Sequence, residues 1–110
     1  MEKIQALAKF LGIEEEEITY TPYDSYEANG AEYLVYTEEE ADDAFDEAIE
    51  RCIEDIILPE IPEPYQYYFD RKQFREDAQN EGRGAYLAGY DGKENEETID
   101  GTAYYIYRMG

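Results

Sequence analysis

The feature that most constrains this chain is a helix predicted between Thr37 and Pro59. Thr37 is a candidate N-cap and Glu40 follows three residues later, which is the spacing of a capping box. Apolar residues then recur at intervals of three and four, which places them on one face of a helix. These residues are Ala41, Ala44, Phe45, Ala48, Ile49, Cys52, Ile53 and Ile56. The helix should run to about Leu58, because Pro59 cannot continue it.

The same helix is strongly acidic. Residues 38–55 include ten acidic residues and one basic residue, Arg51, so their net charge is −9. A helix of this length spans about 27 Å, which gives about one net charge per 3 Å, and one DNA strand carries a charge about every 3.4 Å. The spacing of Asp43, Glu47, Glu50 and Glu54 predicts a straight stripe of carboxylates. Because like charges at this spacing destabilise a helix, the pattern favours a role for the charge, although a solvated face in an acidic protein stays open as the simpler interpretation.

The remaining segments predict an α+β protein. We expect a helix over residues 1–11, ended by Gly12, and a hairpin whose Asn29-Gly30 turn joins residues 18–27 to 31–37, with Pro22 keeping the first strand short or at an edge. A second helix should begin after Asp70 and end near residue 82. Strands are predicted at residues 84–90 and 102–108, joined by a polar link at 91–97. The expected fold is one domain: a small antiparallel sheet with the long acidic amphipathic helix and one or two shorter helices packed on one face.

Composition narrows the class of protein. The chain of 110 residues has 29 acidic and 9 basic residues and no His, so its net charge is −20, while 43% hydrophobic residues suffice for one core. No run of 18 apolar residues and no signal-peptide pattern occurs, so we expect a cytoplasmic protein. The single cysteine, Cys52, excludes a disulfide framework and is expected to be a buried core thiol. A chain this acidic is repelled by nucleic acid and anionic lipid, so the expected partner is a basic protein.

Three other interpretations receive less support. Catalysis is not expected, since there is no His base, no phosphate-binding glycine loop and no carboxylate pair that stands out, and no cofactor is indicated. The loop at Asp91 fails the EF-hand pattern because Lys93 stands where an acid is needed, although loose divalent binding by residues 14–17 or 94–97 stays open. Halophilic adaptation is disfavoured because Glu outnumbers Asp by 20 to 9.

Thirteen tyrosines allow a second kind of contact. Those in strand-like runs, which are Tyr33, Tyr36, Tyr104, Tyr105 and Tyr107, are predicted to lie in the core or on a sheet face. Those near turns, which are Tyr20, Tyr23, Tyr26 and Tyr90, are candidates for exposure. An exposed tyrosine beside carboxylates suits contact with an arginine-rich surface.

Residues 38–110 resemble the C-terminal domain of ArdA-type antirestriction proteins. The resemblance rests on Ile61-Pro62, Tyr68-Phe69-Asp70, Phe74, Asp77 and the closing strand Tyr104-Tyr105-Ile106-Tyr107, preceded by the acidic helix. It implies a phage or mobile-element protein that mimics DNA and disarms a host defence nuclease in the bacterial cytoplasm, either a restriction enzyme or a CRISPR–Cas effector. It leaves a homodimer open.

The sequence therefore predicts an acidic DNA mimic that competes with nucleic acid for a basic channel. The candidate partner-binding residues are Glu39, Asp43, Asp46, Glu47, Glu50 and Glu54 on the helix, together with Glu15, Glu16, Glu94, Glu96 and Glu97. No catalytic or metal-binding residue is assigned. The alternative is an interaction protein that binds its partner through a tyrosine-rich sheet or through the proline loop at residues 59–64, with the charge serving solubility.

Overall fold

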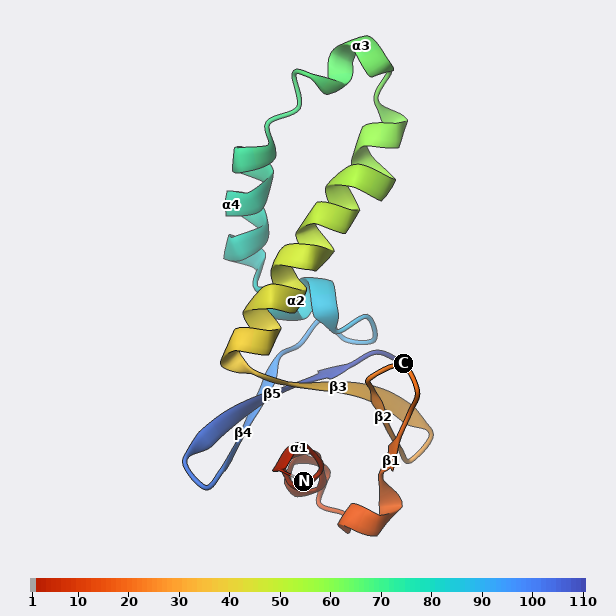
Figure 1. Ribbon diagram of the computed structural model, residues 1–110, viewed down its shortest axis with the longest axis vertical. Helices are drawn as coiled ribbons and strands as arrows, with labels where there is room; N and C mark the ends of the chain where they lie inside the picture. The colour runs from red at the N-terminus through yellow and green to blue at the C-terminus, as the bar shows by residue number, and fades with distance from the viewer. Residues whose placement is uncertain (1) are drawn as a thin grey trace.

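A computed structural model describes residues 2–110 and confirms the α+β class. The helical elements are α1 (Glu2–Leu11), η1 (Glu15–Glu17), α2 (Glu38–Arg51), η2 (Cys52–Ile57), η3 (Leu58–Glu60), α3 (Glu63–Gln66), α4 (Arg71–Glu81) and α5 (Arg83–Leu87). The strands are β1 (Thr19–Tyr20), β2 (Tyr26–Ala28), β3 (Ala31–Thr37), β4 (Asn95–Ile99) and β5 (Thr102–Arg108). They form one antiparallel sheet in the order β1-β2-β3-β5-β4 (Figure 1).

The predicted hairpin is present, but its first arm is divided. Asn29 and Gly30 have φ of 52° and 76°, as a type I′ turn requires, and they join β2 to β3. Residues 18–27 do not form one strand, because the chain reverses at Pro22 and pairs β1 with β2. The Thr21 amide donates to the Ser25 carbonyl at 2.9 Å to close this turn. Pro22 thus separates two short strands and leaves β1 at the edge of the sheet.

Helices cover both faces of the sheet, so the expectation that they lie on one face is wrong. On one face, Tyr33, Val35, Tyr104 and Ile106 pack with residues of α1 such as Leu7. On the other, Tyr107 packs with Ala41 of α2 and with Ala88 after α5. The central strands β3 and β5 are apolar or aromatic on both sides, and each side needs its own cover (Figure 1).

The long helix begins as predicted and changes its winding near the end. The Thr37 hydroxyl accepts from the Glu40 amide at 3.3 Å, and the Glu40 carboxylate accepts from the Thr37 amide at 2.9 Å, which confirms the capping box. After α2, the chain continues as the π-helical segment η2 and the 3₁₀ turn η3, and its helical path ends at Glu60. The wider π turn breaks the spacing of 3.6 residues per turn. Consequently Ile56, expected on the buried face, is 63% exposed. Cys52 is half-buried rather than buried, because it continues the row of the half-buried Ala44 and Ala48 at the edge of the apolar face.

Two of the C-terminal predictions are wrong and two are right. The helix α4 begins after Asp70, whose carboxylate accepts from the Gln73 amide at 3.0 Å, and β5 lies where it was expected. The strand predicted at residues 84–90 is instead the helix α5, which packs against α2. The missing strand is β4, which begins inside the predicted polar link and ends two residues beyond it, at Ile99. It is an edge strand of mostly polar residues. Its side chains alternate in exposure, but the sequence does not show the alternation of hydrophobic and polar residues that predicts a strand.

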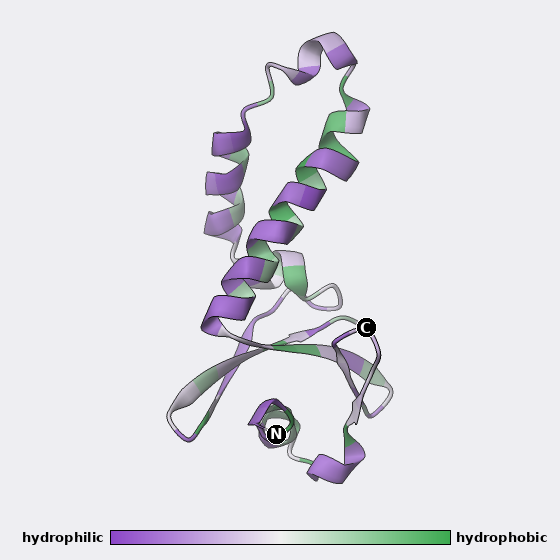
Figure 2. Cartoon of the chain, viewed as in Figure 1, coloured by the Kyte–Doolittle hydropathy of each residue, from purple (hydrophilic) through white to green (hydrophobic). Residues whose placement is uncertain are grey.

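The molecule is elongated, measuring 54 × 27 × 20 Å. One end, which we term the sheet end, consists of the sheet with α1 and α5. The other, which we term the arm, consists of the C-terminal part of α2 with η2, η3, α3 and α4 (Figure 1). The arm has its own small core, made of Phe45, Ile49, Ile53 and Ala78. Hydrophilic and hydrophobic residues alternate along α2 in Figure 2, as one buried face requires.

Candidate acidic interface

The acids of the long helix fall into two rows with different surroundings. The first, which we term the paired row, follows steps of four residues and meets arginines of α4 and α5. It consists of Glu38, Asp42, Asp46, Glu50 and Glu54. The second, which we term the free row, also follows steps of four residues. It consists of Glu39, Asp43 and Glu47, which are exposed and form no ion pair within residues 2–110.

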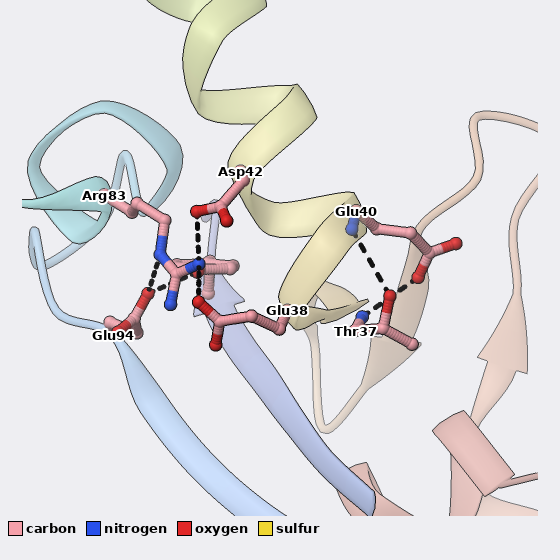
Figure 3. Close-up of polar contacts among 7 residues, drawn as sticks. Thr37, Glu38, Glu40, Asp42, Arg83 and Glu94 are labelled. Atoms are coloured by element: carbon pink, nitrogen blue, oxygen red, sulfur yellow. Dashed lines mark hydrogen bonds and ion pairs between the residues drawn. The ribbon is translucent and has the colours of Figure 1, made fainter.

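Arg83 occupies the inner end of the paired row (Figure 3). Its Nη1 atom lies 3.0 Å from Glu38 Oε1 and 2.9 Å from Asp42 Oδ1. Its Nε donates to Glu94 Oε1 at 2.7 Å, and its guanidinium carbon lies 4.6 Å from the centre of the Tyr105 ring. The side chain is only 13% exposed. One cation therefore joins the start of α2 to the residue that precedes β4.

The pKa shifts of Arg83, Glu38 and Tyr107 are those expected from these contacts. Burial by itself would lower the pKa of Arg83, but the hydrogen bond to Glu94 and the nearby carboxylates raise it well above its usual value. The Tyr105 hydroxyl and the Arg83 guanidinium both stabilise the charged form of Glu38 and lower its pKa. Burial and the hydrogen bond to Glu94 raise the pKa of Tyr107. Glu94 is thus held by Arg83 and Tyr107, and this predicted partner-binding residue has partners within the fold.

The outer part of the paired row meets two more arginines, the half-buried Arg75 and the exposed Arg71. Arg75 lies 3.3 Å from Asp46 and also contacts Glu50, and Arg71 lies 2.7 Å from Glu54 and 3.6 Å from Glu50. The net charge of −9 counted within residues 38–55 therefore overstates the negative charge on one side of the helix. The arginines come from positions 17 to 45 residues away, so a count along the helix alone misses them.

The free row contains two residues of the predicted stripe, Asp43 and Glu47, together with Glu39, and none of its acids forms an ion pair within residues 2–110. Its three carboxylates sit one helical turn apart, at a rise of about 6 Å per step, close to two phosphate steps of ~3.4 Å along one DNA strand. Glu40, their neighbour on the first turn, is paired with Lys3 of α1 at 2.8 Å. The row is held by the capping box at one end and by the packing of Phe45 and Ile49 beneath it. Its carboxylates are therefore carried on a fixed backbone.

The other predicted residues do not extend this row into one continuous track. Glu97 lies 3.7 Å from Lys9 of α1, whereas Glu96 on the same strand is exposed. Glu15 and Glu16 are exposed on η1, which packs beside α1 on the face of the sheet opposite to α2 (Figure 1). The eleven predicted residues thus divide among the free row, the paired row and two acidic groups on other elements.

An open cavity of about 510 Å³ lies beside the first turn of α2. Glu39 of the free row lines it together with Glu2, Lys3 and Tyr104. The Tyr104 hydroxyl donates to the Glu2 carboxylate, and this bond, with burial, raises the pKa of Tyr104 to about 12. The cavity wall therefore presents hydrogen-bonded acids and one lysine that is already paired with Glu40.

The tyrosines of the central strands β3 and β5 are buried or half-buried. Tyr33, Tyr104 and Tyr107 are buried, and Tyr36 and Tyr105 are half-buried, which confirms that strand tyrosines serve the core and the sheet faces. Of the tyrosines near turns, Tyr26 is buried, whereas Tyr20, Tyr23 and Tyr90 are exposed. The sequence analysis missed three further exposed tyrosines, Tyr65, Tyr67 and Tyr68. The sequence signal for this exposure is their position directly after the proline loop, in a segment without aliphatic residues.

No family model, curated protein or solved structure matches this chain. Within residues 2–110, no helix has both the length and the apolar character needed to cross a bilayer.

Proposed function

We propose that this protein is an acidic DNA mimic that inhibits a host DNA-binding defence enzyme by occupying its basic channel. The observation that carries the proposal is the free row, Glu39, Asp43 and Glu47, which is exposed and unpaired on a helix whose other acidic row forms ion pairs with three arginines. If charge served solubility alone, scattered acids would suffice. Here an ordered set of carboxylates remains on one side of a supported helix.

The mechanism is competitive. The carboxylates of the free row pair with Lys and Arg side chains that otherwise hold DNA phosphates. Because the row is mounted on a packed helix, little freedom of the backbone is lost on binding, which favours affinity. The net charge of −20 adds long-range attraction toward a basic channel and speeds association at low salt. Exposed acids outside the row, including Glu96, Glu15 and Glu16, contribute to that field.

The class of target follows from the same chemistry and from the resemblance of residues 38–110 to the ArdA C-terminal domain. Type I restriction enzymes and CRISPR–Cas effectors both hold nucleic acid in positively charged channels. A protein that presents phosphate-like charges on a fixed surface is suited to such a channel. A type I restriction enzyme is therefore the first target to test, and a Cas9-type effector the second.

The test measures displacement of duplex DNA from each purified enzyme by the full chain. The key variant reverses the free row, E39K with D43K and E47K. The matched control, E27K with E76K and E81K, makes the same change in net charge at exposed acids on β2 and α4. We expect the free-row variant to lose inhibition and the control variant to retain most of it, with inhibition weakening steeply as salt is raised.

Circular dichroism and thermal unfolding check that both variants keep the fold. Equal loss of inhibition in the two variants would show that only net charge matters and would remove the role of the free row. Binding that persists in the presence of excess DNA and high salt would contradict mimicry altogether.

A further inference from the structure

The outer end of the arm carries a group of exposed aromatic and apolar side chains. Tyr67 is 91% exposed, Tyr68 78% and Tyr65 62%, and Ile56 at the end of the long helix is 63% exposed. We term these four residues the tip. Tyrosine is enriched in the energetically important parts of protein interfaces, where its ring is buried and its hydroxyl forms a hydrogen bond. In the central strands of the sheet, by contrast, Tyr33, Tyr104 and Tyr107 are buried.

The tip is ordered by hydrogen bonds of its own. The Gln66 side-chain amide donates to the carbonyls of Leu58 at 2.8 Å and Ile61 at 3.1 Å, which fastens α3 to the end of the long helix. The Tyr68 amide donates to the Tyr65 carbonyl at 3.0 Å. The rings of Tyr67 and Tyr68 meet edge to face, with centres 5.7 Å apart. A surface fixed in this way loses little entropy when a partner binds.

The π-helical segment η2 explains how Ile56 comes to be exposed. The Leu58 amide donates to the Ile53 carbonyl, five residues back, so the turn that contains Ile56 is wider than an α turn. Ile53 remains fully buried, whereas Ile56, three residues later, turns outward. π turns are rare and recur at functional sites. This one leaves an aliphatic side chain exposed at the outer end of the arm instead of in its core.

Charge identifies the kind of partner that the tip fits. Residues 52–70 contain five acids and no Lys or Arg. Asp55, Glu60 and Glu63 are exposed and form no ion pair within residues 2–110. A second copy of this chain would bring acids against acids, and nucleic acid or an anionic membrane would be repelled in the same way. A cationic protein surface is complementary, and arginine suits it best, because a guanidinium pairs with carboxylates and stacks on tyrosine rings.

We propose that the tip is a second docking surface, which binds an arginine-bearing basic surface of a protein partner. Ile56 lies roughly 14 Å along the long helix from Glu47, the nearest member of the free row, so the two surfaces are separate. The rings of Tyr65, Tyr67 and Tyr68 receive guanidinium groups, Ile56 covers their aliphatic stems, and the surrounding carboxylates supply charge. The two surfaces differ in character, because contacts of the free row are electrostatic, whereas the tip adds stacking that survives high salt.

The test uses the full chain with isotopically labelled tyrosines and two synthetic peptides, one of alternating Arg and Gly and the same peptide with Lys for Arg. Ring signals are followed by NMR during titration, first at low salt and then at about 1 M salt, where the screening length falls to ~3 Å. We expect the Arg peptide to shift the signals of Tyr65, Tyr67 and Tyr68, and to retain this effect at high salt. The Lys peptide should bind severalfold more weakly and lose its effect there.

The variant Y67S with Y68S should lower affinity for the Arg peptide about tenfold, the combined effect of two exposed cation–π contacts. The matched control is Y23S, since Tyr23 is 83% exposed, lies beside Asp24 and is outside the arm. Equal binding of the two peptides, or equal losses in the two variants, would overturn the proposal. Self-association that Y67S with Y68S abolishes would assign the tip to a second copy and overturn it as well. The free-row variant, E39K with D43K and E47K, should leave the shifts of the tip signals unchanged, which separates this proposal from DNA mimicry.

Discussion

The two ends of the molecule use the same residue types for opposite purposes. At the sheet end, Tyr104 and Tyr107 are buried and their hydroxyls donate to Glu2 and Glu94. In the arm, Tyr67 and Tyr68 stand in solvent. Arginine follows the same trend, since the side chain of Arg83 is 13% exposed and that of Arg71 is 47% exposed. Tyr20, Tyr23 and Tyr90 at the margin of the sheet end are also exposed, so the contrast is between the layered centre of the sheet and the outer end of the arm.

The number of packed layers at each end of the molecule explains this difference in exposure. The sheet end has three layers, so residues of the middle layer meet neighbours on both sides (Figure 1). The arm is essentially one pair of helical segments, and its small core around Ile49 and Ile53 leaves the outer sides of both uncovered. A pair of helices can bury only the side chains that face each other, so the remaining aromatic and acidic side chains of the arm are exposed to solvent.

The largest expected effect contrasts one tyrosine from each end. Tyr107→Ala should lower the free energy of unfolding by about 3–5 kcal/mol, because it empties a buried site and leaves Glu94 without its hydroxyl donor. Tyr67→Ala should change it by less than about 0.5 kcal/mol, as expected for an exposed side chain. Urea unfolding followed by circular dichroism measures both values. Similar losses for the two variants would mean that the tip is part of the core, contrary to its exposure.

The next effect concerns the arginines that meet the paired row. Arg83→Gln should cost about 2–3 kcal/mol, since it leaves Glu38, Asp42 and Glu94 close together without their cation. Arg71→Gln should cost less than about 0.5 kcal/mol, because exposed ion pairs contribute little. Thermal unfolding at low and raised salt compares them. Added salt should recover part of the stability of Arg83→Gln by screening the repulsion among the three acids, and no such recovery would contradict this explanation.

A smaller effect is expected at a glycine that holds α5 against the loop before β4. A Cβ at Gly84 would lie 2.7 Å from the Gly92 carbonyl oxygen and 2.8 Å from the Glu94 amide nitrogen, both of which are backbone atoms. Gly84→Ala should therefore cost about 1–3 kcal/mol through displaced backbone. Gly89→Ala is the matched control, since its Cβ would meet only the Met109 carbonyl oxygen at an ordinary 3.5 Å. Equal stability of the two variants would show that the loop yields without cost.

These contrasts also show which parts of the molecule a sequence can predict. The capping box at Thr37, the type I′ turn at Asn29 and the Asp70 cap were predictable, because each depends on residues within a few positions of one another. The helix α5 was not, since its place depends on the close approach of Gly84 to a loop eight to ten residues later.

The candidate site divides in the same way. The acidic rows follow from helical spacing, and the exposure of the free row accords with the stripe predicted through Asp43 and Glu47. Arg71 pairs with Glu50 and Glu54 because α4 folds back along the long helix. The local sequence around these residues does not predict that contact. The exposure of Ile56 depends on a π turn, whose winding overrides the periodicity that predicted burial.

The smallest expected effect is seen only at alkaline pH and concerns the titration of Tyr104 at the sheet end. The Tyr104 hydroxyl donates to Glu2, which together with burial raises its pKa to about 12 from the ordinary value of 10.0. A raised folded-state pKa means that this tyrosine stabilises the fold fully below pH 10 and that its contribution is lost as the pH rises from about 10 to about 12. Glu2→Gln removes the charge beside the hydroxyl, so the Tyr104 pKa should fall toward its ordinary value. Tyrosinate absorbance of this variant and of Tyr104→Phe, followed against pH, isolates the step. A titration curve of Glu2→Gln that superimposes on that of the parent chain would show that Glu2 does not hold this hydroxyl.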